Sequence, residues 1–368
     1  MRNKEKMEKE AGRRRLRRAA LTLVLGATLL ALAGPRLVLS QSSPGRPISD
    51  LVRSLEVGRP VSHGHLTIVP VYLTAVRLRT EFVPFDEAVK NGWLEITELD
   101  GGSVPEVKIS NRSKRTIYLM GGEILTGAKQ DRMLASDLLL GPGTTDLVVP
   151  VYCVEHGRWT QTTGTFTTRN IIGTSALRDK AQKQAAEAQS EIWDTISEQN
   201  RVMGVAAPTS AYQAAYDAAS NKARIKVIEE KMTAIPRLYK DTVGVVIALG
   251  GRVVSVDIFG NPALFAKQWP KILRSSALSA LTHKTPGLLD QRAAAALLRT
   301  FPAMNYQVKK GLDLGMDHTS IETGANIKAL VYQGAVLHLA AFPEDDGRMK
   351  VIDDRTADER IRVIREAE

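Results

Sequence analysis

The sequence predicts an α+β fold, in which an N-terminal antiparallel β-rich part, sandwich or barrel-like, is followed by helices and a second mixed sheet region. Residues 48–154 contain short alternating or β-branched runs separated by turn signals such as Asn91-Gly92, a pattern typical of antiparallel sheets. After Trp159, segments rich in Ala, Gln, Glu and Lys with helical periodicity alternate with further strand pairs.

The individual elements follow from the same patterns. In the first part we expect strands at 66–73, 93–99, 106–110, 116–120 and 147–154. Residues 160–174 are polar and without a clear period, so we expect a surface loop there. Helices are expected at 175–199, 210–238, 263–282 and 288–300. Paired strands are expected at 242–249 with 252–258, and at 329–332 with 335–340.

The first forty residues have the three parts of a secretory leader. A basic stretch ends at Arg18, an apolar run covers residues 19–33, and small residues offer cleavage sites after Ala33 and after Ser40. The apolar run has roughly 15 residues, fewer than the roughly 20 that a spanning helix needs. We therefore expect a cleaved signal peptide, with a single N-terminal transmembrane anchor as the alternative. Both place the body outside the cytoplasm, in the periplasm or at the cell surface, with membrane contact only through this segment.

Beyond the leader, the composition divides the chain into three further parts. Residues 41–47 are rich in Ser, Pro and Gly and are expected to be a tether. The body covers 48–342, with a β-rich part at 48–159 and an α/β part at 160–342. Residues 343–368 are expected to be a charged tail.

The formal charge of +10 is concentrated at the N-terminus. Residues 1–18 contribute +6 and Arg36 adds one, so the chain from Gln41 onward carries +3. This balance is ordinary for a body of this size, so the sequence predicts no nucleic-acid partner, and it identifies no protein partner.

Cys153 is the single cysteine of the sequence, so no internal disulfide can form. It ends an apolar, strand-like run. The thiol could be a nucleophile or a metal ligand, but a free cysteine in such a run is usually small, buried and inert, which is the interpretation we favour.

The densest group of polar residues in the body extends from Gly121 to Arg132. Its glycines would let backbone amides approach a ligand, and Lys129 with Arg132 could hold an anionic group such as a phosphate. It lacks the G-K-[ST] ending of a phosphate-binding P-loop. The alternative is a charged turn whose side chains tie neighbouring strands together.

A second polar group follows the strand at 147–154. Glu155, His156 and Arg158 lie where this strand passes into a loop, a common place for functional side chains. His156 could act as a general base, although an exposed loop histidine is the commoner case.

Other motifs are weaker. His63 and His65 would share one face of a strand, but they lack a third ligand at metal-site spacing, so the sequence predicts no metal. Asp257 ends a strand before a helix and is either catalytic or a support of the turn. No G-x-S-x-G or H-E-x-x-H motif is present, so no reaction and no cofactor follow from the sequence.

Residues 122–132 and 149–159 together are similar to the two-part signature of a bacterial family, the ADP-ribosylglycohydrolase- and rhodanese-phosphatase-associated domain family. Later similar stretches are Ala176-Leu177-Arg178, Glu191-Ile192-Trp193, Gly244-Val245-Val246, Asp257-Ile258-Phe259 and residues 338–342. The resemblance extends from about residue 66 to 342 and implies a link to ADP-ribose or NAD metabolism, without an established activity. Position by position, it implies a site lined by Glu123, Lys129, Gln130, Arg132, Glu155, Arg158 and Trp159.

Two hypotheses follow. In the first, the exported domain binds or hydrolyses an anionic, nucleotide-like or ADP-ribose-like molecule. Its catalytic acid and base would be Glu123 and Glu155, and its ligand-binding residues would be Lys129, Gln130, Arg132, Arg158 and Trp159. In the second, the domain is a non-catalytic envelope module that binds another protein. The first requires the side chains of Glu123, Arg132, Glu155 and Arg158 to converge on an open pocket, whereas the second pairs and buries these four. Whether the protein is an enzyme stays open.

Overall fold

A computed structural model describes residues 43–76, 78–99, 105–322 and 325–343. The expected leader and the tail beyond Pro343 lie outside these ranges. Within them, no helix is both long enough and apolar enough to cross a membrane. The description below concerns the unit that begins at Pro44.

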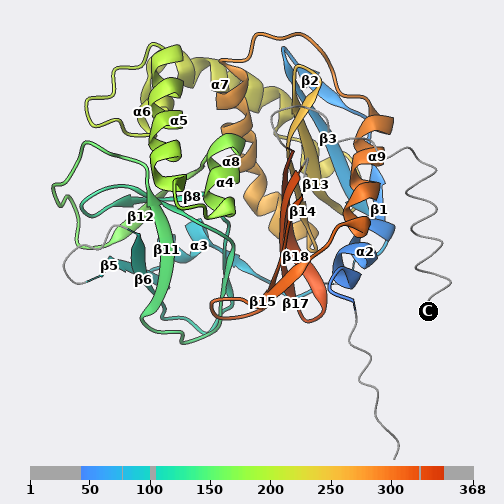
Figure 1. Ribbon diagram of the computed structural model, residues 1–368, viewed down its shortest axis with the longest axis horizontal. Coiled ribbons are helices and arrows are strands. Elements are labelled where there is room, and N and C mark those ends of the chain that lie inside the picture. The colour runs from blue at the N-terminus through green and yellow to red at the C-terminus, as the bar shows by residue number, and fades with distance from the viewer. Residues whose placement is uncertain (1–42, 77, 100–104, 323–324, 344–368) are drawn as a thin grey trace, which may run out of the picture. The chain divides into compact units, whose positions relative to one another are not determined.

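The described residues form an α+β fold, as the sequence predicts, and their largest sheet has nine strands (Figure 1). The strand order is β1-β3-β13-β14-β18-β17-β16-β15, with β2 paired to β3, and all pairings are antiparallel. The strands are β1 (Leu55–Val57), β2 (Val61–His63), β3 (Leu66–Leu73), β13 (Thr242–Leu249), β14 (Arg252–Phe259), β15 (Gln307–Lys310), β16 (Met316–Glu322), β17 (Ala325–Tyr332) and β18 (Ala335–Pro343). Because β3 pairs with β13, this sheet contains strands from both the expected β-rich part and the expected α/β part.

The other strands form a six-stranded antiparallel sheet that curls into a half-barrel, and a small three-stranded sheet. The order in the half-barrel is β12-β8-β9-β11-β6-β5, and the small sheet has the order β10-β7-β4, with β4 and β7 parallel. The strands are β4 (Val83–Pro84), β5 (Leu94–Glu98), β6 (Glu106–Asn111), β7 (Ile117–Leu119), β8 (Glu123–Gly127), β9 (Arg132–Leu134), β10 (Leu138–Leu140), β11 (Leu147–Cys153) and β12 (Phe166–Ile172).

Helices cover both faces of the nine-stranded sheet. The helices of the described residues are α2 (Arg46–Arg53), α3 (Phe85–Lys90), α4 (Ser175–Lys183), α5 (Ala188–Val202), α6 (Ala214–Asp217), α7 (Ala219–Met232), α8 (Pro262–Ala280) and α9 (Gln291–Thr300), with short 3-10 turns at Ile235–Arg237 and Phe301–Ala303. Of these, α3 packs on the half-barrel and the small sheet. The longest, α8, begins at Pro262 because the Asn261 side chain accepts a hydrogen bond from the Leu264 N–H at 2.9 Å.

The buried apolar residues form three cores. One lies between the nine-stranded sheet and α4, α5, α7 and α8, and includes Trp269 of α8. A second lies on the opposite face of that sheet under α2 and α9. The third fills the half-barrel together with α3 and the small sheet. The first core therefore lies where the half-barrel and the nine-stranded sheet meet.

Four local expectations are wrong. The helix expected at 210–238 is divided, because Ala218 separates α6 from α7, and α7 ends at Met232. Residues 160–174 are not all loop, because 166–172 form β12, an edge strand in which the polar residues from Thr167 to Asn170 hide the strand pattern. The helix expected at 175–199 is interrupted at Gln184, which has a left-handed φ of 51° and ends α4. Helix α2 begins at Arg46, inside the range expected to be a tether.

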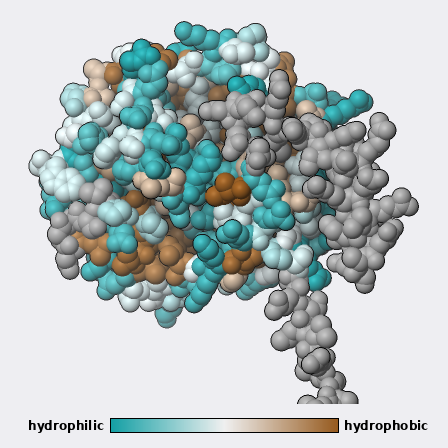
Figure 2. All heavy atoms as spheres, viewed as in Figure 1, coloured by the Kyte–Doolittle hydropathy of each residue, from teal (hydrophilic) through white to brown (hydrophobic). Residues whose placement is uncertain are grey.

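Most of the face seen in Figure 2 is hydrophilic. Hydrophobic residues gather over β6 and β11, at the lower left of that view. Here Val148 of β11 keeps 38% of its surface exposed. The exposed Trp159 lies at the end of the second sequence signature.

Candidate functional site

The first signature forms the β8–β9 hairpin of the half-barrel. Its turn contains Gly127 and Ala128, both with positive φ, of 120° and 48°. A side chain at Gly127 would collide with Thr163, whose hydroxyl lies 2.4 Å from an added Cβ. The carboxylate of Asp131 closes the turn by accepting the Gly127 N–H at 2.9 Å.

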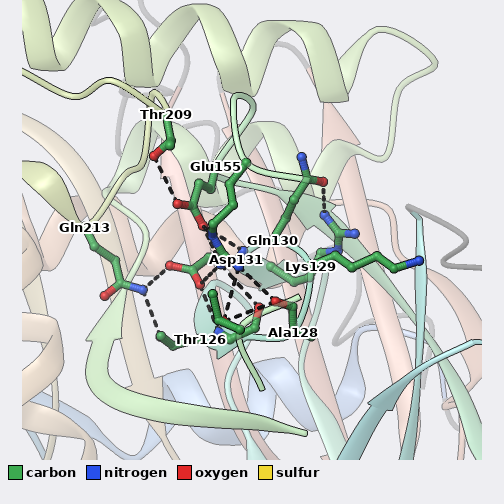
Figure 3. Close-up of polar contacts among 12 residues, drawn as sticks. Thr126, Ala128, Lys129, Gln130, Asp131, Glu155, Thr209 and Gln213 are labelled. Carbon is green, nitrogen blue, oxygen red and sulfur yellow. Dashed lines mark hydrogen bonds and ion pairs between the residues drawn. The ribbon is translucent and has the colours of Figure 1, made fainter. Parts of the chain in front are cut away.

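Asp131, Glu155 and Arg158 form a closed polar group, called here the brace network. Figure 3 shows its two carboxylates, Asp131 and Glu155. The Arg158 guanidinium contacts Glu155 Oε2 at 2.6 Å and Asp131 Oδ1 at 3.1 Å. It also donates to the carbonyl oxygen of Ala128 at 2.8 Å. Burial raises the pKa of Asp131, while Arg158 opposes this shift.

Two side chains from the segment between α5 and α7 complete the brace network. Thr209 donates to Glu155 Oε1 at 3.0 Å, and Gln213 donates to the second carboxylate oxygen of Asp131. Figure 3 shows both approaching the carboxylates from the side opposite Lys129. The predicted acid or base Glu155 and the predicted ligand Arg158 are therefore engaged with each other and with protein groups.

The other side of the hairpin carries Gln130 and Arg132. Arg132 is completely buried and donates from Nη1 to Gln130 Oε1 at 2.7 Å. The same Gln130 oxygen accepts a hydrogen bond from the Cys153 thiol at 3.3 Å. The expectation that Cys153 is a buried residue is confirmed. The Nε and Nη2 atoms of Arg132 have no hydrogen-bond partner among the residues that the structure describes.

Lys129 and Trp159 lie beside Arg132, and with Glu98 these four residues are called the signature face. The Lys129 ammonium lies 5.5 Å from the centroid of the Trp159 ring, and Trp159 is 53% exposed. In Figure 3 the Lys129 side chain extends away from the brace network. Glu98, the last residue of β5, has carboxylate oxygens 3.9 Å from Arg132 Nη2 and 4.0 Å from Lys129 Nζ.

Glu123 belongs to neither group. It is completely buried, its Oε1 lies 2.5 Å from Nζ of Lys271 in α8, and its Oε2 accepts the Met120 N–H at 2.9 Å. Lys271 also forms an ion pair with Asp86 of α3. Burial raises the pKa of Glu123 from 4.5 to about 7, although Lys271 opposes the shift. None of these contacts involves a residue of the signature face. The catalytic role of Glu123 stays a prediction.

A second buried polar group joins four elements and is called here the junction cluster. Arg178 of α4 binds both oxygens of Asp257, at 2.6 and 3.1 Å. His338 of β18 contacts Asp257 through Nε2 at 3.3 Å and Asp137, in the β9–β10 loop, through Nδ1 at 2.6 Å. Two small cavities border this cluster, and Arg178 lines both. Each cavity has room for about one water molecule.

The junction cluster was not predicted as a site. Arg178, Asp257 and His338 lie in three of the later stretches that carry the family resemblance, so a signal was present for three of its four members. Asp257 pairs with Arg178 and His338, and it lines one of the two cavities. Asp137 had no sequence signal, because its loop carries no motif.

The remaining histidines show no metal arrangement. Among the described residues, no group of three or more His, Cys, Asp or Glu side chains could hold a metal ion. The ring of His65 lies 6.0 Å from that of His283, and the ring of His156 lies 4.1 Å from that of Trp193. His156 is thus packed against α5 rather than directed toward the signature face.

Comparison with known families gives one result. A family model described as ARPP-1, the ARG and Rhodanese-Phosphatase-superfamily-associated Protein domain, matches residues 54–342, which is most of the chain. The chain belongs to the ARPP-1 family. The function of this family is uncharacterised. No curated protein and no solved structure matches the chain. The ARPP-1 match includes the brace network, the signature face and the junction cluster.

Proposed function

We propose that the chain is exported and that its ARPP-1 domain binds a small anionic, nucleotide-like molecule on the signature face. The observation that carries the proposal is Arg132, a completely buried arginine with two nitrogens that make no hydrogen bond to the described residues. Leaving such a donor unsatisfied costs about 1–3 kcal/mol, and more for a charged group. The oxygens of an anionic ligand would supply the missing acceptors.

The neighbours of Arg132 support a ligand with two chemical parts. Lys129 adds a second cation, suited to a phosphate group. Trp159 offers a half-exposed aromatic ring, and flat bases stack on such rings. The ADP-ribosylglycohydrolase association in the family's name makes ADP-ribose the first ligand to test.

The proposal is limited to binding. Both predicted acid or base residues interact with other protein groups. Glu155 contacts Arg158 and Thr209, and Glu123 forms an ion pair with Lys271. Neither carboxylate contacts a residue of the signature face in any of these interactions. We therefore assign no reaction to the domain.

Binding is tested by calorimetric titration of the purified full-length chain with ADP-ribose. We expect the wild type to bind and Trp159→Ala to weaken binding roughly 5- to 100-fold, because one stacked base contributes about 1–3 kcal/mol. Leu288→Ala is the matched control, since Leu288 is an apolar side chain outside the signature that is exposed even more than Trp159. Equal affinity in Trp159→Ala and the wild type, or no binding of ADP-ribose, ADP or ribose 5-phosphate, would contradict the proposal.

Export is tested by fractionating cells that express the full chain and sequencing the N-terminus of the protein. We expect the body outside the cytoplasm, with a new N-terminus after Ala33 or Ser40. An intact N-terminus in the membrane fraction would identify the anchored alternative. Recovery of the intact chain in the cytoplasmic fraction would refute export.

A further inference from the structure

Glu98 is the one acidic member of the signature face, and its carboxylate faces both cations. Its Oε1 accepts the backbone N–H of Lys129 at 3.0 Å, which fixes its position. The same oxygen lies 3.9 Å from Arg132 Nη2, and Oε2 lies 4.0 Å from Lys129 Nζ. Both separations exceed the 2.7–3.2 Å of a nitrogen–oxygen hydrogen bond, by about 0.7 Å or more.

The brace network provides an internal comparison. Arg158 contacts its two carboxylates at 2.6 and 3.1 Å, so charge and hydrogen bonding are both satisfied there. Around Glu98 the charges are close but the cations make no hydrogen bond to the carboxylate. An incoming oxyanion could therefore form hydrogen bonds with Arg132 and Lys129 that Glu98 does not make.

We propose that Glu98, placed between Lys129 and Arg132, occupies the position of the ligand's anionic group and so selects ligands whose phosphate part carries two negative charges, as the diphosphate of ADP-ribose and the phosphate of AMP do. This inference rests on the proposed function. A singly charged ligand group only replaces the charge of Glu98. Its electrostatic attraction to Lys129 and Arg132 therefore adds little binding energy when it displaces that carboxylate. A dianionic phosphate brings one charge more and three acceptor oxygens, which suit the fork of an arginine and the ammonium of a lysine.

AMP and cyclic AMP form a matched pair of probes. They share the base and the ribose, but at about pH 7.5 the phosphate of AMP is mostly a dianion, whereas the phosphodiester of cyclic AMP is a monoanion. For the full-length wild type we expect AMP to bind roughly tenfold more tightly than cyclic AMP. In Glu98→Gln, which removes the competing charge, we expect cyclic AMP to gain roughly tenfold in affinity, so that the preference largely disappears.

Two further variants make the result decisive. Glu95→Gln removes the same charge from the same strand, where Glu95 pairs with the exposed Arg112 on the other face, and we expect it to keep the wild-type preference. Glu98→Asp keeps the charge on a shorter side chain and should give an intermediate preference, which decides the question if Glu98→Gln does not fold.

The outcomes separate the two proposals. If the wild type binds AMP and Glu98→Gln keeps the same preference, or loses affinity for both nucleotides, the role of Glu98 is overturned while the binding site stands. If neither the wild type nor any Glu98 variant binds either nucleotide, both proposals fail.

Discussion

Two arginines of the same signature have opposite surroundings. Each of the three nitrogens of Arg158 has a partner among Glu155, Asp131 and nearby backbone carbonyls. Among the described residues, the side chain of Arg132 has one hydrogen bond, to Gln130, although a guanidinium can donate five. This difference is why we assign Arg158 to the stability of the hairpin and Arg132 to the ligand.

The assignment of Arg158 predicts a large loss of stability when it is removed. In Arg158→Ala, Asp131 and Glu155 would remain as buried carboxylates without their cation, so we expect the free energy of unfolding to fall by about 3–5 kcal/mol. Arg115→Ala is the control, because its ion pair with Glu81 is exposed and should contribute less than about 1 kcal/mol. Urea unfolding measures both. Equal small losses in the two variants would show that the network does not brace the hairpin.

At the scale of elements, the sequence predicts those whose own residues carry a regular pattern. Strands β3, β13 and β14 are continuous apolar or β-branched runs with glycines or turns at their ends, and their predicted bounds agree with the structure to within one residue. Helix α8 is equally clear, because Pro262 and the Asn261 cap mark its start. Such elements need little information from distant parts of the chain.

Elements formed by distant pairing were not predictable in the same way. Strands β8 and β9 lie inside the polar signature, where buried Glu123 and Arg132 break any alternation of apolar and polar residues. Their strand conformation depends on pairing with β12 and β11. The edge strand β15 has every residue exposed and carries no apolar pattern at all.

The same distinction applies to the candidate site. The signature identified Lys129, Arg132 and Arg158 as charged neighbours, and the structure places the first two on the β8–β9 hairpin and Arg158 in the loop after β11. Their separation into the brace network and the signature face depends on strand alternation. It also depends on Glu98, which belongs to β5 and lies 31 residues before Lys129. Similarly, the partner of Glu123 is Lys271, 148 residues away, and no local pattern connects them.

At the scale of the whole described unit, the junction cluster connects parts of the fold with separate cores. Asp137 follows β9 of the half-barrel, Arg178 belongs to α4, and Asp257 and His338 belong to the nine-stranded sheet. His338 contacts both carboxylates at once. Because these charges are buried, their protonation should affect how firmly the half-barrel and the sheet are held together.

The pKa shifts in these buried groups set the direction of that effect. Burial would lower the pKa of His338, but Asp137 and Asp257 raise it above its usual 6.5. Its contribution to stability is therefore complete below pH 6.5 and is lost as the pH rises through the raised value. The pKa of Glu123 is raised from 4.5 to about 7, so its contribution to stability is complete below 4.5 and is lost by about pH 7.

The pKa values of Asp137 and Asp257 lie below 3.8, because His338 and Arg178 outweigh the effect of burial. Their contributions to stability are lost only in acid.

These directions predict that the free energy of unfolding falls as the pH rises from about 5 to about 8. The slope is up to about 1.4 kcal/mol per pH unit for each group that is protonated in the folded state and deprotonated in the unfolded state. Urea midpoints measured along this range test the prediction. His338→Gln should flatten the fall above pH 6.5, where the unfolded chain has released the histidine proton and the folded chain still holds it, and Glu123→Gln should flatten it between 4.5 and about 7. A wild-type midpoint that stays constant or rises with pH would mean that the buried histidine is neutral. The junction would then be held by the Arg178–Asp257 pair, which does not titrate in this range.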